Sequence, residues 1–152
     1  MPIVARELGP EGALVGIRLG PPSFRSRMLR KHGLPEPEPV RVLAQIDTGA
    51  HSTGLDADLF ALLGLDGQVD VQVDVQGVLT CSTGTEPHLS PVYYVSLALV
   101  CPGGGDLCFP ALRVLAHTFG PREQARAIIG RDVLERCVLN YDGPGAEFTL
   151  AF

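Results

Sequence analysis

Short apolar runs, separated by turns rich in glycine and proline, are the feature that most constrains this chain. The runs at 14–19, 40–46, 92–100 and 109–115 have the length of strands rather than of helices. The 18 glycines and 13 prolines make up about a fifth of the 152 residues, against roughly 12% in average usage. Because many short strands must fold over one another to bury their apolar faces, we predict a mainly β fold, a small closed or folded-over barrel.

The rest of the chain predicts seven or eight strands in all, with two or three short helices. Valines alternate with polar residues over 69–75, which is typical of a strand with one solvent-exposed face. The polar, turn-rich segment 77–91 then joins it to the long strand 92–100 as a hairpin. Ser23 and Asp56 are suited to cap helices that end at Gly33 and Gly64. Further strands are expected at 127–130, 138–141 and 148–152, and a brief helix at 132–136.

We expect one domain over 14–152, preceded by a flexible N-terminal arm over 1–13, where Gly9-Pro10-Glu11-Gly12 interrupts any long strand. The segment 23–39 resembles an insertion between two strands. Its expected helix carries several basic residues, and its end, 35–39, is a stiff Pro-Glu repeat. The helix is either a basic recognition patch or, as we favour, a solvated face.

Charge and cysteine usage exclude several classes of protein. Twelve Lys and Arg against 17 Asp and Glu give a net charge of −5, which disfavours nucleic acid as a partner. No apolar run approaches the roughly 20 residues of a membrane helix, and the N-terminus lacks a signal-peptide layout. We therefore expect a cytoplasmic protein with no membrane partner. The four cysteines show no metal-ligand spacing and are interpreted as free thiols, with a Cys101–Cys108 disulfide as the alternative.

The candidate for chemistry is Asp47, which follows the apolar run 40–46 and precedes Thr48 and Gly49. A carboxylate at the end of a buried strand is partly desolvated, and the glycine lets a ligand or a second chain approach the backbone closely. Three residues alone are weak support, and a strand-ending Asp followed by a simple turn is the alternative interpretation.

Two motifs in order, with a hairpin between them, resemble the retropepsin-like aspartic proteases, the single-domain relatives of retroviral proteases. The first is the apolar strand leading into Asp47-Thr48-Gly49-Ala50. The hairpin over 69–100 corresponds to the flap of that family, and the second motif is Ile128-Ile129-Gly130-Arg131-Asp132. The resemblance covers roughly 14–152 and implies an acid-protease-type β-barrel.

The resemblance implies an aspartic endopeptidase that acts on a peptide or protein. Two carboxylates would share a proton and activate a water, without metal or organic cofactor. The chain has one Asp-Thr-Gly, so the second Asp47 would come from another copy in a homodimer. The implied support residues are Thr48, Gly49, Ala50, Ile129, Gly130, Arg131 and Asp132, and the implied substrate contacts are Gly49, His51, Thr83 and Gly84.

Some positions depart from the family pattern. His51 stands where retroviral members often carry an Asp that pairs with the helix arginine, so the partner of Arg131 is open. The flap tip has only Gly84, and the segment 101–126 is long for a viral enzyme, so the chain is similar to a cellular, bacterial type.

Alternatives follow from these departures. One is a non-catalytic peptide-binding or dimerisation module with the same fold; a thiol enzyme is a distant third. The terminal run 148–152 is either an interface strand of the dimer or the last barrel strand.

Overall fold

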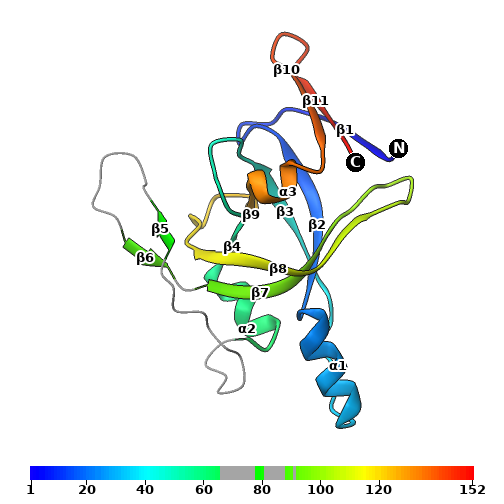
Figure 1. Cartoon of the computed structure of the whole chain (residues 1–152). Coiled ribbons are helices and arrows are strands. Elements are labelled where there is room, and N and C mark those ends of the chain that lie inside the picture. Colours follow the sequence, from blue (N-terminus) through cyan, green and yellow to red (C-terminus); the bar gives the residue numbers. More distant parts are fainter. Residues whose placement is uncertain (66–77, 81–87, 91) are drawn as a thin grey trace.

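The computed structural model describes residues 1–65, 78–80, 88–90 and 92–152, and in the two short strands 78–80 and 88–90 it describes the backbone only. Figure 1 shows the arrangement of the elements. In chain order they are β1 (Ile3–Glu7), β2 (Leu14–Gly20), α1 (Ser23–Lys31), β3 (Val40–Ile46), β4 (Gly54–Asp56), α2 (Ala57–Leu62), β5 (Val78–Thr80), β6 (His88–Ser90), β7 (Val92–Leu99), β8 (Leu107–His117), β9 (Ala125–Ile129), α3 (Arg131–Leu134), β10 (Val138–Asp142) and β11 (Glu147–Ala151).

Six strands close into a barrel in the order β2-β3-β9-β4-β8-β7, with β7 returning to β2. The prediction of a mainly β fold with a closed barrel and a few short helices is thereby confirmed. β3 runs parallel to β9, and β4 lies between β9 and β8. Each barrel strand therefore has a hydrogen-bonded neighbour on both sides, although the contact of β4 with β8 is limited to Gly54–Asp56 and Leu115–His117.

Period-two alternation explains how the barrel is filled. In β2, Val15, Ile17 and Leu19 are fully buried, whereas the residues between them are half-buried on the outer wall. Helix α2 covers one part of this core: the ring of Phe60 stacks on that of Tyr93 from β7, with 3.9 Å between ring centroids.

Helix α2 begins and ends where the sequence predicts. The Asp56 carboxylate accepts a hydrogen bond from the backbone N–H of Asp58 at 3.3 Å and so caps the helix. Gly64 has φ +65°, the left-handed conformation of a glycine that stops a helix. In α1 the prediction was wrong in one detail: the capping residue is Pro22, and Ser23 is the first residue of the helix.

A second sheet, in the order β1-β11-β10, joins the two termini. Part of the N-terminal arm that we expect to be flexible forms β1, which pairs with β11 from Ile3↔Ala151 to Glu7↔Glu147. Val4, Phe148 and Leu150 point from this sheet into the core and are buried. β11 is therefore not a barrel strand, because the barrel closes without it, and both of its edges are paired within the chain.

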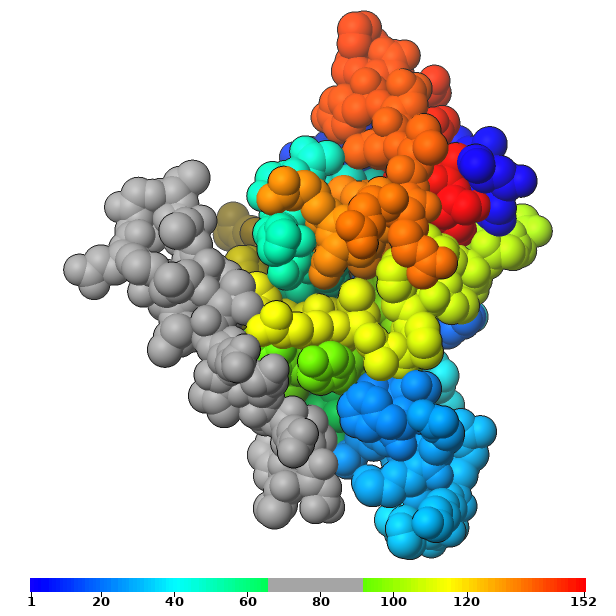
Figure 2. Space-filling view, viewed as in Figure 1, coloured from blue at the N-terminus to red at the C-terminus, as the bar shows by residue number. Residues whose placement is uncertain are grey.

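The sequence patterns missed the shortest elements. β4 has only three residues, too few for an alternating pattern to be visible. β5 and β6 pair antiparallel within the segment interpreted as a turn-rich connection, from Val78↔Ser90 to Thr80↔His88. The strand expected at 69–75 lies outside the described residues. Figure 2 shows α1, in blue, standing out from the barrel at the opposite end of the molecule from the β10–β11 turn.

The described cysteines are free, as predicted, and they differ in environment: Cys101 is buried, Cys108 exposed and Cys137 half-buried. The Cys137 thiol donates a hydrogen bond to the backbone oxygen of Val133 at 3.6 Å. Its burial raises the pKa of the Cys137 thiol above the ordinary value of 9.0, and the neighbouring Arg136 opposes this only partly. Cys81 lies outside the described residues.

We therefore expect Cys108 to react with iodoacetamide faster than Cys137 at pH 8. The thiolate is the reacting species, and a raised pKa lowers the thiolate fraction at that pH. Peptide mapping by mass spectrometry after short labelling times gives the rate at each cysteine. Equal rates for the two residues would contradict the burial of Cys137.

Candidate active site

Asp47 lies where two parallel barrel strands end side by side. Ile46, the last residue of β3, is paired in register with Ile129, the last residue of β9. The backbone N–H of Asp47 donates to the carbonyl of Ile129 at 3.0 Å, and that of Ile46 donates to the carbonyl of Ala13 at 2.9 Å. The base of the Asp47 loop is thus fixed by sheet hydrogen bonds on both sides.

The loop that follows orients the carboxylate. Asp47 Oδ1 accepts hydrogen bonds from the backbone N–H groups of Gly49 at 2.8 Å and Ala50 at 3.2 Å. A Cβ atom at position 49 would lie 3.1 Å from that same oxygen, so a glycine keeps the turn uncrowded. Asp47 is half-buried, whereas Thr48 and Gly49 are exposed. The carboxylate is therefore held by one oxygen at the edge of the core, next to an exposed backbone.

A second layer of contacts ties this loop to α3. The Ala50 carbonyl accepts from the backbone N–H of Arg131 at 3.0 Å. Thr53, which is fully buried, donates its hydroxyl to Asp132 Oδ1 at 2.7 Å and its backbone N–H to Asp132 Oδ2 at 2.9 Å. The same hydroxyl accepts from the backbone N–H of Gly130 at 3.1 Å. These bonds join segments 77 to 79 residues apart in sequence and make the two motifs one unit.

Beyond this unit, one ion pair stiffens the adjoining strands. Arg126 Nη1 of β9 lies 2.9 Å from Asp56 Oδ2 at the end of β4. Asp56 is only 7% exposed and also caps α2, so one carboxylate connects a barrel strand, its neighbour and a helix. Sequence patterns marked Asp56 as a cap but gave no signal for Arg126 or Thr53, because their partners are distant in sequence.

The structure brings together most of the residues singled out from the sequence. Asp47, Thr48, Gly49 and Ala50 form the loop, and it meets Ile129, Gly130, Arg131 and Asp132 through the contacts above. His51 is exposed. Thr83 and Gly84 lie outside the described residues. The exposed side chain of Arg131 has no ion pair with any residue that the structure describes.

In the described parts of the chain, no three His, Cys, Asp or Glu side chains gather in a way that could hold a metal ion. Within the same residues, no helix has the length and apolar character needed to cross a membrane.

Replacing Thr53 tests how strongly the two motifs are joined. In Thr53→Val the buried Gly130 N–H loses its acceptor and the half-buried Asp132 carboxylate loses a donor. We expect the free energy of unfolding to fall by about 2 kcal/mol, whereas Thr53→Ser, which keeps the hydroxyl and removes a methyl group, costs about 1 kcal/mol. Urea unfolding at one fixed protein concentration measures both. A valine variant more stable than the serine variant would contradict the role of the hydroxyl.

Comparisons with known proteins relate the fold to solved structures. No family model matches the chain, and no curated protein matches its sequence. The crystal structure of a retropepsin-like aspartic protease from Rickettsia conorii is similar over 99% of this chain and 90% of its own, with a TM-score of 0.55 and 14% sequence identity. The retroviral protease-like domain of Ddi1 from Leishmania major covers 87% of this chain and 83% of its own, at 17% identity and a TM-score of 0.40.

The likeness to the Rickettsia structure extends over nearly the whole chain, and at 14% identity it bears on the fold. It agrees with the closed barrel and with the resemblance read from Asp47-Thr48-Gly49-Ala50 and Ile128-Ile129-Gly130-Arg131-Asp132. This chain has the retropepsin-like aspartic protease fold.

Proposed function

We propose that this protein is a homodimeric aspartic endopeptidase in which Asp47 from each of two identical chains activates a water molecule. The observation that carries the proposal is the geometry of Asp47. Its Oδ1 is held by two backbone N–H groups of its own loop, at the end of a strand and beside an exposed Thr48-Gly49 backbone. An acid held this way in a retropepsin-like fold is suited to act on a bound peptide.

The chemistry needs two such carboxylates a few ångströms apart. One takes a proton from water as general base, and the resulting nucleophile attacks the scissile carbonyl. The other donates a proton to the carbonyl oxygen as general acid. Two like charges this close disfavour the doubly ionised state, so the pair shares one proton and titrates as a coupled unit. Each later proton transfer, to the leaving amine, uses the same two groups.

A single chain supplies one of the two acids. Asp47-Thr48-Gly49 occurs once in the 152 residues. Asp142-Gly143 sits in the turn between β10 and β11, where the Asp142 carboxylate accepts from the backbone N–H of Gly145 at 2.9 Å. Asp66-Gly67 lies outside the described residues. The second carboxylate is therefore assigned to a second copy, and the exposed Thr48 and Gly49 would pack beside the two-fold axis.

The proposed substrate is an extended peptide or an unfolded protein segment, bound by strand addition along the site. Gly49 and His51 on the Asp47 loop, with Thr83 and Gly84 on a flap that includes the β5–β6 hairpin, are the proposed contacts. The support residues act by positioning Asp47, and the reaction as proposed uses no cofactor. Free Cys101, Cys108 and Cys137 are in keeping with a reducing, cytoplasmic setting.

Subunit mixing tests the shared site. Wild-type protein at fixed concentration is equilibrated with a threefold excess of Asp47→Asn, and cleavage of a peptide mixture is followed by mass spectrometry. Because a mixed dimer has only one Asp47 carboxylate, we expect activity to fall to about a quarter through random pairing. The matched control is a threefold excess of Asp142→Asn, the same change in a turn, which should raise activity in proportion to the total chain.

Activity unchanged by the excess of Asp47→Asn would mean that one chain carries out the reaction alone, and the dimeric site would be wrong. Wild-type protein that sediments as a dimer and cleaves nothing would favour the non-catalytic peptide-binding module instead.

A further inference from the structure

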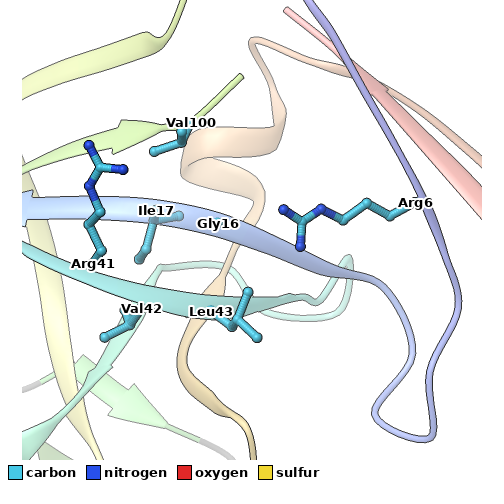
Figure 3. A pocket seen from close by; sticks show the side chains of 7 residues that line it. All are labelled: Arg6, Gly16, Ile17, Arg41, Val42, Leu43 and Val100. Carbon is cyan, nitrogen blue, oxygen red and sulfur yellow. The ribbon is translucent and has the colours of Figure 1, made fainter. Parts of the chain in front are cut away.

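A pocket lies on the outer wall of the barrel, apart from the Asp47 loop. Its volume is about 400 Å³, and its lining includes Gly16 of β2, Leu43 of β3 and Val100, with Arg6 and Arg41 at its ends (Figure 3). Arg41 precedes Asp47 by six residues of extended chain, about 20 Å at 3.3 Å per residue. The pocket is therefore separate from the proposed catalytic centre.

Gly16 makes the hollow. A Cβ atom built on Gly16 would meet no other atom within 4 Å, so the space a side chain would occupy is open. Leu43 is the cross-strand neighbour of Gly16 on β3, and the backbone N–H of Val100 donates to the Gly16 carbonyl at 3.0 Å. The floor is thus backbone, and the walls beside it are aliphatic. Such a hollow fits an apolar group better than water.

The ends of the pocket are positively charged. Figure 3 shows the Arg6 side chain reaching from β1 toward Gly16, and Arg41 on the opposite side of the pocket. Arg6 and Arg41 are exposed, and neither forms an ion pair within the part of the chain that the structure describes. This concentration of arginine stands in a chain whose net charge is −5.

The strand register places two arginines side by side next to the pocket. Arg41 lies directly opposite Arg18 on the antiparallel strands β3 and β2, and like charges in that relation destabilise a sheet. Asp106 neutralises Arg18 alone, at 3.2 Å. Arg18 thus has an acidic partner within the chain, and Arg41, its cross-strand neighbour, is the guanidinium left for an acidic ligand.

We propose that this pocket binds a carboxylate carried on an apolar body. A guanidinium fork suits a carboxylate, which it can hold by two parallel hydrogen bonds, and the Gly16 hollow takes the apolar part. Both a small aliphatic acid and the C-terminal carboxylate of a peptide with apolar last residues have this chemistry. The site is a binding site only and does not depend on the proposed protease activity.

Isothermal titration at low ionic strength tests the site, with the Asp47→Asn protein so that no peptide probe is cleaved. The probes are octanoate and the N-acetylated tripeptide Ala-Leu-Leu with a free C-terminal carboxylate. Their neutral counterparts, octyl glucoside and the tripeptide amide, report apolar contact alone. We expect saturable binding of at least one acid and at least tenfold weaker binding of its counterpart. Tighter binding of octanoate identifies a small acid as the source, and tighter binding of the tripeptide identifies a chain terminus.

Further substitutions in the Asp47→Asn protein test whether the acid binds in this pocket. Gly16→Val fills the hollow and should weaken binding more than tenfold, while Gly9→Val, at a glycine that also has open space, should leave it unchanged. Arg6→Gln and Arg41→Gln should each weaken binding about two- to fivefold, since both guanidinium groups are exposed. No saturable binding of either acid, equal binding of the neutral counterparts, or full binding by a folded Gly16→Val protein would overturn the proposal.

Discussion

Asp47→Asn is expected to abolish the proposed peptide cleavage, with a loss of at least about 10³-fold. The amide keeps the shape of the side chain, and its oxygen can still accept from the backbone N–H groups of Gly49 and Ala50. It cannot act as a general base or share a proton with its partner. The fold and the dimer should therefore persist while the reaction stops, and cleavage of a peptide mixture with sedimentation analysis measures both.

Asp142→Asn is the matched control for this loss. Asp142 accepts a turn hydrogen bond from the backbone N–H of Gly145 at 2.9 Å, a bond that an asparagine oxygen can also accept. It should retain wild-type activity. Cleavage by Asp47→Asn at the rate of Asp142→Asn would show that Asp47 is not the catalytic acid.

Gly130→Ala is expected to have the largest effect on folding. A Cβ atom at this position would lie 2.6 Å from the carbonyl carbon of Ser52, 2.8 Å from its oxygen and 3.0 Å from the backbone nitrogen of Thr53. These are backbone atoms of the loop that follows Asp47, and they are fixed by the bonds between Thr53 and Asp132. The methyl group must push the two motifs apart, so we expect a loss of about 3 kcal/mol or more in the free energy of unfolding.

Gly16→Ala gives the comparison for that change. Gly16 lies in β2 with open space around an added Cβ, so the same substitution should be neutral or stabilise the protein by about 0.5 kcal/mol. Urea unfolding of both variants at one protein concentration measures the difference. Similar stabilities for Gly130→Ala and Gly16→Ala would show that the loop and α3 are not in tight contact.

Much of the fold is predictable from local patterns, because strands and helix ends depend on neighbouring residues. The apolar run before Asp47 predicts β3 with its observed bounds, and Asp56 and Gly64 predict both ends of α2. Each of these signals lies within a few residues of the element it describes. The resemblance carried by the two motifs also anticipates the barrel, since a family pattern summarises long-range contacts that composition does not reveal.

Contacts between distant segments leave no such local signal. Gly9 and Gly12 hydrogen-bond to each other in a tight turn between β1 and β2, and β1 pairs with β11 near the other terminus. β11 has the apolar character of an edge or barrel strand, but it is the middle strand of a separate sheet. The pairing of β1 with β11 buries Val4, Phe148 and Leu150 together in the core. That burial depends on the whole fold and not on the residues near either strand.

In the candidate site, too, some features can be predicted from the sequence and others depend on the tertiary structure. The sequence alone determined that a carboxylate, Asp47, follows an apolar strand and precedes Thr48-Gly49, because strand character and glycine content are local properties. Only the tertiary structure decided that Thr53 is buried against Asp132 and that Gly130 has no room for a side chain. Those facts require β3, β4 and β9 to meet around one point, and a closed barrel brings together strands that are far apart along the chain.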